Sequence, residues 1–387
     1  MPWRETRVVD ERCRFVMTYL RGQVPMEELC AEYRISRPTG YKWVERYEQE
    51  GPRGLHDRSR APHHCPHRID AQTAQWMIED RRAHPTWGAR KIVVRFKQRY
   101  PRKAAPAPSS VSELFKREGL VRARKRAKQP PERVGRAAHA VNEPHQLWTL
   151  DFKGQFRTGD HRYCYPLTIM DSASRYLLAC RGQLNTRGAW VLPFIDRLFQ
   201  EHGLPQAVHS DNGAPFACYP SIAGLSRLSV HWLKLGIRVQ RSRPACPQDN
   251  PAHERMHRTL KADTARPPAA SLRAQQQRFD RFVAEYNHER PHEALADQTP
   301  AQLYRSSTRP YPARLPEPAY PGHFEHRRVI GNGCLKWKGQ FIFVSGVLSG
   351  ETLGLEEVDD GLWYVYFYDH LLARFDEQTG KLFEAPL

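Results

Sequence analysis

Three acidic residues stand where carboxylates could do chemistry together. Asp151 lies inside the apolar run LWTLDF, Asp211 follows a short strand-like run and precedes Asn-Gly, and Glu254 lies in the first turn of a helix predicted to begin at Asn250. Burying a carboxylate costs folding free energy unless it is paired or binds a metal, so we expect a cation next to Asp151. Asn at the N-cap and Pro251 at the first helical position favour that helix start.

The ligand type predicts the chemistry. Carboxylate oxygens prefer Mg²⁺, for which Mn²⁺ can substitute, and two such ions about 3.5–4 Å apart suit phosphoryl transfer. Arg258 and Lys261 follow Glu254 on the same helix face and could meet a phosphate. Alternatives stay open: Asp211 could be a turn residue, and Glu254 could simply favour the helix start. Asp171, in Asp-Ser-Ala between two strands, is interpreted as a turn residue.

The elements around these carboxylates predict an α/β domain over residues 144–308. Strands are expected over 148–152, 162–170, 175–181, 206–210 and 238–241, and helices over 189–202, 231–235, 250–263 and 271–288. Strands followed by alternating helix and strand indicate a mixed sheet. Residues 217–229 are irregular and look like an insertion.

Charge indicates the partner. The chain of 387 residues has a net charge of +18, and residues 1–140 hold 31 Lys and Arg against 16 Asp and Glu. Such a concentrated basic segment predicts nucleic-acid binding. No apolar run is long enough to span a membrane, no signal peptide is recognisable, and the eight Cys are scattered singly. We therefore expect a soluble, cytoplasmic protein and exclude membrane-spanning and disulfide-framework classes.

Residues 1–54 predict a helix-turn-helix domain. Helices are expected over 11–21, 26–33 and 37–50, the last with Ser36 as N-cap and with Tyr41, Val44 and Tyr47 buried. In this motif the start of the second helix of the pair faces base edges. The predicted DNA-facing residues are Arg37, Thr39, Gly40 and Lys42, with Arg46 nearer the DNA backbone. An ordinary three-helix bundle is the alternative.

A linker over 55–68 leads to a second predicted helix-turn-helix domain over 69–122. One helix is expected over 71–82, a second opens at Trp87, and Ser109 and Ser110 are expected to cap a third. The predicted DNA contacts of this domain are Arg90, Lys91, Ser109 and Ser110. A basic linker over 123–143 follows, in which Arg124 and Lys125 are expected to track phosphates.

The C-terminal region is predicted to be separate from the carboxylates. A Pro-rich linker over 309–322 precedes short alternating strands over 323–387. This pattern predicts a small all-β barrel or sandwich, interpreted as a binding or assembly module.

The motifs together resemble a known family. LWTLDFKG, VHSDNGAPF, CPQDNPAHERMHRTLK, YNHERPHEAL and TPAQLY are similar, in this order, to the integrase-core DDE transposases of bacterial insertion sequences, which are related to retroviral integrases. The resemblance covers about residues 10–305. It implies a ribonuclease-H-like core, two helix-turn-helix domains that bind the element's ends, and a Mg²⁺-dependent reaction with Asp151, Asp211 and Glu254 as catalytic, metal-binding triad. It also implies a structural role for Tyr286, Asn287, Arg290 and Pro291.

Two features depart from the family pattern. The stretch 212–253 is longer than usual, with the excess expected at 217–229, near the site or on DNA. Pro251 stands where the family usually has Gly.

The resemblance further implies a reaction and its partners. Cleavage at the element's end frees a 3′-OH that attacks target DNA in the same pocket. The expected partners are double-stranded DNA, namely the terminal inverted repeats and the target, and further copies of the chain in a dimer or higher oligomer, with no membrane. Two alternatives remain: a catalytically inactive DNA-binding regulator derived from a transposase, and a structure-selective nuclease.

Overall fold

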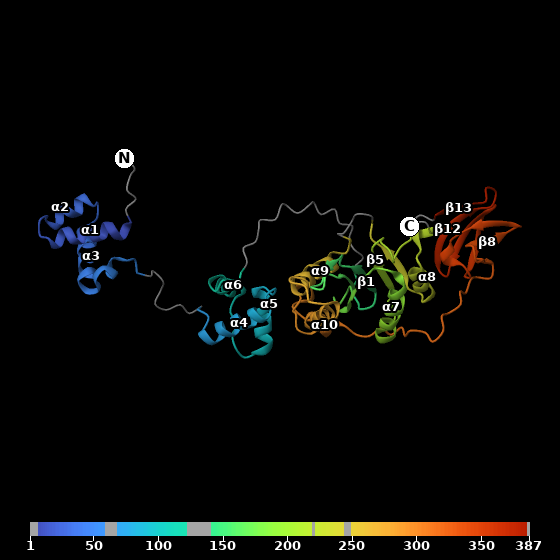
Figure 1. Cartoon of the computed structure of the whole chain (residues 1–387), viewed down its shortest axis with the longest axis horizontal. Helices are drawn as coiled ribbons and strands as arrows, with labels where there is room; N and C mark the ends of the chain where they lie inside the picture. Colours follow the sequence, from blue (N-terminus) through green and yellow to red (C-terminus); the bar gives the residue numbers. More distant parts are fainter. Residues whose placement is uncertain (1–6, 59–67, 122–140, 219–220, 244–248, 385–387) are drawn as a thin grey trace. The chain divides into compact units, whose positions relative to one another are not determined.

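The computed structural model describes residues 7–58, 68–121, 141–218, 221–243 and 249–384. The chain divides into two compact units, residues 1–68 and 69–387, and each is described by itself (Figure 1). Arg124 and Lys125 lie outside the described residues. Among the described helices, none has the length and apolar character needed to cross a bilayer.

The first unit contains three helices, α1 (Val8–Leu20), α2 (Met26–Glu32) and α3 (Arg37–Glu50), followed by a short 3₁₀ turn (Gly51–Leu55). Ser36 is the N-cap of α3, as predicted, and its hydroxyl accepts a hydrogen bond from the Thr39 amide at 3.4 Å. The apolar core is built from all four elements; its buried members include Phe15, Val16, Leu29, Trp43, Val44 and Leu55.

Two predictions for α3 are wrong. Tyr41 is 53% exposed, and Trp43 takes the core position instead, because the buried face of the helix is rotated from the expected one. Gly40 faces the core rather than DNA: a Cβ there would lie 2.8 Å from the sulfur atoms of Cys30 and Met26. Its lack of a side chain lets α3 approach α2 closely.

The second unit begins with another three helices, α4 (Ala71–Ala83), α5 (Ala89–Arg99) and α6 (Pro108–Arg117). Their apolar faces form one core that includes Met77, Trp87, Ile92, Phe96, Val111 and Phe115. The prediction that Ser109 and Ser110 cap α6 is wrong. The helix begins at Pro108, with Ala107 as N-cap, because Pro is well suited to the first helical position.

A mixed six-stranded sheet follows, made of β1 (Leu147–Phe152), β2 (Phe156–Arg157), β3 (Tyr163–Asp171), β4 (Leu177–Gln183), β5 (Ala207–Ser210) and β6 (Arg238–Arg241). The order is β2-β3-β1-β5-β6, with β4 also paired to β3. The β1–β3 and β3–β4 pairs are antiparallel, whereas β1–β5 and β5–β6 are parallel. This is the mixed α/β core that the sequence predicts.

Helices cover both faces of this sheet. On one face Trp148 and Leu150 of β1 pack in a cluster with α7 (Gly188–His202) and α8 (Arg227–Lys234). On the other face Met170 and Cys180 pack in a cluster with α9 (Pro251–Thr264) and α10 (Leu272–His288). Since side chains alternate along a strand, Thr149 and Asp151 point to the side opposite Trp148 and Leu150, the side of α9.

The segment after α10 is tied to the sheet by its own side chains. The side-chain oxygen of Asn287 accepts a hydrogen bond from the backbone N–H of Leu177 at 2.8 Å, and its side-chain nitrogen donates one to the Leu177 carbonyl at 2.9 Å. Tyr286 is buried. A 3₁₀ turn (Glu293–Leu295) and α11 (Pro300–Leu303) complete this segment.

The C-terminal region is all-β, but its sheets do not close into the predicted barrel. Five antiparallel strands run in the order β13-β12-β11-β10-β7, and β8 (Cys334–Trp337) and β9 (Gln340–Phe343) form a separate hairpin. Strands β7 and β13 are the two edges of the five-stranded sheet. The bounds of its strands are β7 Glu325–Arg328, β10 Thr352–Asp359, β11 Leu362–Phe367, β12 His370–Asp376 and β13 Lys381–Glu384.

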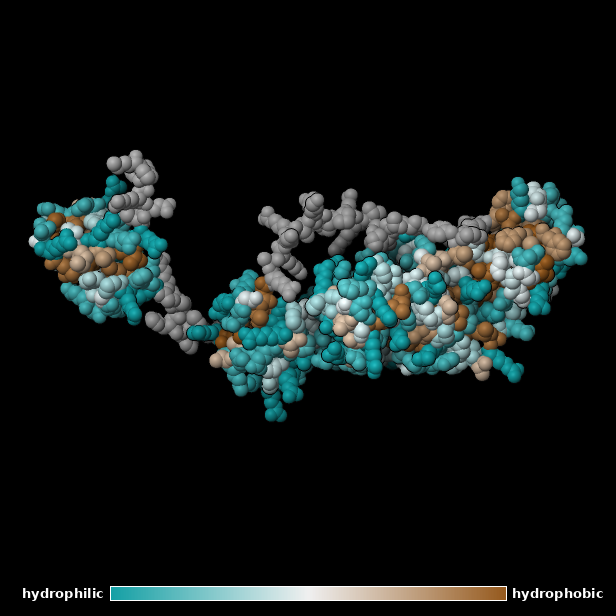
Figure 2. Space-filling view, in the orientation of Figure 1, coloured by the Kyte–Doolittle hydropathy of each residue, from teal (hydrophilic) through white to brown (hydrophobic). Residues whose placement is uncertain are grey.

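The surface of this region includes exposed aromatic side chains. Phe341 and Phe343 of β9 and Phe383 of β13 are exposed, and Figure 2 shows apolar surface over this part of the chain.

The insertion 217–229 has a packing role. Its residues Ile222 and Leu225 belong to the same apolar core as Leu348, Phe367 and other residues of the C-terminal strands. A 3₁₀ turn (Ile222–Gly224) presents them, and Ser226 then caps α8. The insertion therefore joins the mixed-sheet domain to the C-terminal sheets.

Candidate active site

Strand pairing brings the two aspartates together. Strand β5 runs parallel to β1 with Thr149 opposite His209, so Asp151 and Asp211, two residues further along each chain, lie at adjacent strand ends. Burial, together with the charges of Asp211 and Glu254, raises the pKa of the Asp151 carboxyl to about 7, although the charge of Lys153 opposes the rise. Burial also raises the pKa of Asp211. Such raised values are expected where buried carboxylates lie close together.

Glu254 faces Asp151 across a cavity. The Asn250 side chain caps α9 by accepting a hydrogen bond from the His253 amide at 3.4 Å, and Pro251 occupies the first turn, as predicted. The cavity is lined by Asp151, Lys153, Glu254, His257, Arg258 and Lys261, among others. Two carboxylates thus share the cavity with four basic side chains, those of Lys153, Arg258, Lys261 and Arg266, an arrangement suited to a metal that meets a phosphate.

Asp211 and Asp171 differ in their surroundings. Among the described residues Asp211 does not line the cavity, and its Oδ1 accepts a hydrogen bond from the Gly213 amide at 3.1 Å. Asp171 is fully buried and accepts hydrogen bonds from the His145 amide at 2.7 Å and from the Ser174 amide and hydroxyl at 2.9 and 2.6 Å. Asp171 therefore holds the β3–β4 turn together.

Two histidines that sequence reasoning missed lie behind Asp151. The Thr168 hydroxyl is 2.6 Å from Nε2 of both His253 and His257, and it donates to the Asp151 carbonyl at 3.0 Å. Both imidazoles then donate their Nε2 protons to Thr168. The Thr149 hydroxyl lies 2.8 Å from Nδ1 of His253. The only sequence signal was their spacing of four residues on the face of α9 that meets the sheet.

These histidines are neutral groups. Burial lowers the pKa of His253 to about 3 and that of His257 to about 2. Nδ1 of His257 lies 3.4 Å from Oδ2 of Asp151, and candidate ligand atoms of Asp151, His253 and His257 all lie within 4.8 Å of one another. Neutral imidazoles supply no charge to balance Asp151, so the carboxylates here fit a divalent cation.

The predicted DNA contacts of α3 lie on an open surface. Arg37 and Lys42 are exposed, and Arg46 is half-buried. Nζ of Lys42 and Cζ of Arg46 lie 5.0 and 5.1 Å from the centre of the Trp43 ring. Thr39 forms part of the helix cap, where its hydroxyl lies 2.9 Å from that of Ser36.

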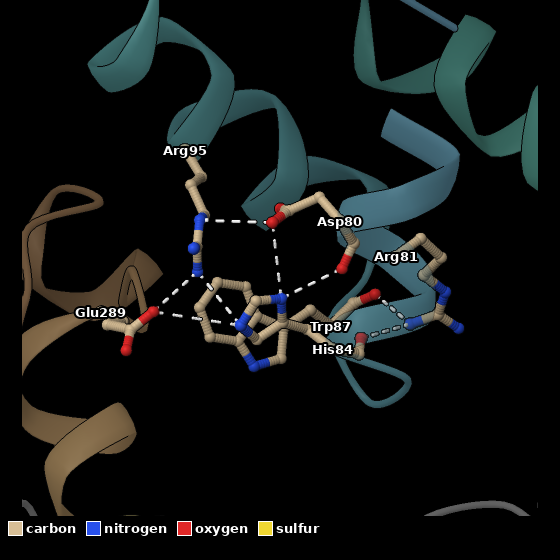
Figure 3. Close-up of polar contacts among 6 residues, drawn as sticks. All are labelled: Asp80, Arg81, His84, Trp87, Arg95 and Glu289. Atoms are coloured by element: carbon tan, nitrogen blue, oxygen red, sulfur yellow. Dashed lines mark hydrogen bonds and ion pairs between the residues drawn. The ribbon is translucent and has the colours of Figure 1, made fainter. Parts of the chain in front are cut away.

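The predicted DNA contacts of the second unit divide into two groups. Ser109 is exposed and Ser110 half-buried at the start of α6. Arg90 and Lys91, at the start of α5, instead contact the segment that follows α10: Arg90 forms ion pairs with Glu293 and Asp297, and Lys91 donates to the Pro291 carbonyl. Arg95 forms an ion pair with Glu289 in the same region (Figure 3).

Family models match both the mixed-sheet domain and the helical domains that precede it. Models described as "Integrase core domain" match residues 141–247 and 235–300. A "Helix-turn-helix domain" matches residues 11–63 and a "Homeodomain-like domain" matches residues 39–115. Residues 141–300 of the chain are thus similar to integrase core domains, and residues 11–115 are similar to helix-turn-helix and homeodomain-like domains.

Retroviral polyproteins match part of this chain. The chain is 28% identical over 120 residues to the Pol polyprotein of Radiation murine leukemia virus (strain Kaplan), covering 31% of this chain and 19% of the relative. It is 31% identical over 121 residues to the Pol polyprotein of Feline endogenous virus ECE1, covering 31% of this chain and 11% of the relative. The chain therefore matches less than a fifth of the length of these relatives.

Solved structures include retroviral integrase cores. The HTLV-2 integrase catalytic core domain in complex with magnesium aligns with 12% identity and a TM-score of 0.33, over 42% of this chain and 98% of that one. The catalytic core domain of BIV integrase aligns with 20% identity and a TM-score of 0.32, over 41% and 93%.

Proposed function

We propose that the protein is the DNA transposase of a bacterial insertion sequence. It binds the element's ends and catalyses Mg²⁺-dependent strand cleavage and strand transfer with Asp151, Asp211 and Glu254. The observation that carries the proposal is the parallel register of β1 and β5, which makes Asp211 the neighbour of Asp151, while Glu254 lines the same cavity as Asp151.

The chain's own residues have distinct roles in this reaction. Asp151, Asp211 and Glu254 would hold two Mg²⁺ ions, for which Mn²⁺ can substitute. When bound, the ions activate the attacking oxygen and neutralise charge on the leaving one. Lys153, Arg258 and Lys261 line the cavity and orient the scissile phosphate by charge. Thr168 fixes the Asp151 backbone by donating to its carbonyl.

The partners follow from the same proposal. The helix-turn-helix domains hold the terminal inverted repeats, and the cavity accepts first the end and then the target DNA. Two ends are joined to the target in one event, so the protein acts as a dimer or a higher homo-oligomer.

The test is transposition from a donor plasmid that carries the gene with its native flanking DNA. Glu254→Gln removes a ligand charge without changing shape, so we expect transposition to disappear. Asp151→Asn and Asp211→Asn should each lower Mg²⁺-dependent nicking of end DNA by about 10²–10³-fold or more while end binding persists. Glu201→Gln, an exposed acid on α7, is the matched control and should cut normally.

Other outcomes separate the alternatives. Substantial cleavage by any one triad variant would break the triad assignment. A protein that binds ends equally with and without Mg²⁺ and ignores Glu254→Gln would be an inactive regulator. One that cuts but never joins DNA would be a structure-selective nuclease.

A further inference from the structure

The helix-turn-helix part of the second unit contacts the mixed-sheet domain through a charged face. The residues of α4–α6 that make this contact, which we call the docking face, are His84, Trp87, Arg90, Lys91 and Arg95. The residues that they contact, which we call the acceptor segment, are residues 285–297 together with Asp263. We infer that the docking face is an intramolecular positioning surface that holds α4–α6 against the catalytic helix α9, and that Arg90 and Lys91 do not contact DNA.

The two arginines of the docking face are each held by ion pairs with two carboxylates. Arg90 lies between two carboxylates, 2.7 Å from Glu293 and 3.1 Å from Asp297. Arg95 bridges Glu289 at 2.9 Å and the largely buried Asp80 at 3.3 Å (Figure 3). A guanidinium held by two carboxylates has little free charge to offer a phosphate.

Lys91 is engaged in a different way. Its ammonium donates to the Pro291 carbonyl, and burial lowers its pKa to about 8, with the charge of Arg290 acting in the same direction. A lysine that binds DNA phosphates is normally exposed and fully charged, because it acts by releasing counterions from DNA. Lys91 is only partly exposed, and its ammonium is already bound to a carbonyl of the same chain.

Aromatic packing fixes the centre of the face. Trp87 is fully buried, the His84 ring lies 4.2 Å from it, and the Arg290 guanidinium lies 5.9 Å from its centre. Arg290 comes from the acceptor segment, so this cation–π contact joins the two parts.

The contact extends to the catalytic helix. Arg290 lies 4.0 Å from Asp263. Burial raises the pKa of Asp263, and a hydrogen bond with the Thr86 side chain opposes this rise. Asp263 and Glu254 both belong to α9, nine residues apart, or about 13 Å along a helix axis. A rigid helix thus links the docking face to the candidate catalytic glutamate.

The orientation leaves α6 available for DNA. Its first residues, Pro108 and Ser109, are exposed, whereas the start of α5 is occupied by the acceptor segment. DNA held by α6 would therefore lie at a fixed distance from Glu254. This consequence for cleavage rests on the proposed function, but the docking itself does not.

Salt dependence of end binding separates docking from DNA contact. If Arg90 touched a phosphate, Arg90→Ala would reduce the slope of log affinity against log salt by about 1. We expect no change in this slope for Arg90→Ala, and a reduced preference for the end in Arg37→Ala as a matched control on α3. A reduced slope for Arg90→Ala would overturn the inference.

A charge swap tests the positioning role. Arg90→Glu should increase hydrogen–deuterium exchange over residues 289–297, and adding Glu293→Arg should restore protection. At saturating end DNA, the cleavage rate should fall about tenfold in Arg90→Glu and recover in the double variant, because a misplaced reacting group costs rate rather than affinity.

The two proposals fail in distinguishable ways. If the wild-type protein does not cleave end DNA, the proposed function fails, but the hydrogen–deuterium exchange data still show whether the docking face contacts the acceptor segment. Unchanged exchange in Arg90→Glu would refute the docking even in an active enzyme.

Discussion

Two helices of this protein begin with basic residues and have different surroundings. At the start of α3, Arg37 and Lys42 are exposed, and the nearest carboxylate of Arg37, that of Glu27, is 4.0 Å away and itself exposed. At the start of α5, Arg90 is held by two carboxylates and Lys91 by a carbonyl, all from residues 291–297. The charge of α3 is free for a polyanion, whereas that of α5 is satisfied within the chain.

The difference teaches that a basic helix start does not identify a DNA contact by itself. Charge counts along the sequence treat Arg37 and Arg90 alike, but the partners of Arg90 lie about 200 positions downstream. What matters is whether a carboxylate is brought within hydrogen-bond distance by the fold, because a paired cation gains less from a phosphate. Substitutions in each helix in turn test whether the two helix starts differ in this way.

The largest effect is expected from the tryptophans that anchor the two units. Replacing a buried Trp with Ala costs about 3–5 kcal/mol, so Trp43→Ala and Trp87→Ala should each lower the free energy of unfolding by that order. Only Trp87→Ala should also expose residues 289–297 to hydrogen exchange, because Trp87 alone packs against Arg290. Denaturant unfolding and exchange on the full chain measure both effects.

A more conservative variant tests whether the exposure in Trp87→Ala comes from lost docking or from general unfolding. Trp87→Phe keeps an aromatic ring and should retain most of the docking. If Trp43→Ala exposed residues 289–297 as strongly as Trp87→Ala, the distinction between the two units would be lost.

An intermediate effect is expected for sequence preference. Arg37→Ala or Lys42→Ala should reduce the preference for the element's end over random DNA by about 1–3 kcal/mol, the value of a good base contact. Competition binding at fixed salt measures the preference, with Lys381→Ala, exposed on β13 of the C-terminal sheet, as a lysine control. Uniform weakening on all sequences would place the α3 residues on phosphates instead.

The local secondary structure around the three acidic residues was predictable from the sequence, whereas the side chains that surround them were not. Asp151, Asp211 and Glu254 stand in local contexts that a single pass can recognise: an apolar strand, a strand end before Asn-Gly, and a capped helix start. His253 and His257 were missed because their role depends on Thr149 and Thr168, which come from two paired strands. Such contacts arise only when distant segments meet.

The fold errors have the same origin. Tyr41 and Trp43 both fit a helical face, and only the packing of α1 and α2 decides which is buried. The short alternating strands of the C-terminal region were predictable, but barrel closure depends on whether β7 and β13 pair, which strand patterns do not encode. The insertion 217–229 could not be assigned because its partner is the C-terminal core.

The smallest effect is expected from pH at the docking face. Hydrogen bonding to Asp80 raises the pKa of His84, although burial and Arg95 oppose the rise. A group whose pKa is raised on folding stabilises the folded state below its unfolded value, about 6.5, and loses this contribution as pH rises through the folded value. Because Asp80, Arg95 and Glu289 all face His84, charging it reinforces contacts with two acids and opposes one cation.

Melting of the full chain between pH 6 and 8.5 tests this. Wild type should lose stability with rising pH relative to His84→Gln, which does not titrate, by at most about 2–4 °C in Tm, as for a contribution near 1 kcal/mol. First-unit variants such as Arg37→Ala should follow the wild-type profile, since α3 has no such histidine. Identical profiles for wild type and His84→Gln would mean that the docking face is held by its arginines and Trp87 alone, with no contribution from protonation of His84.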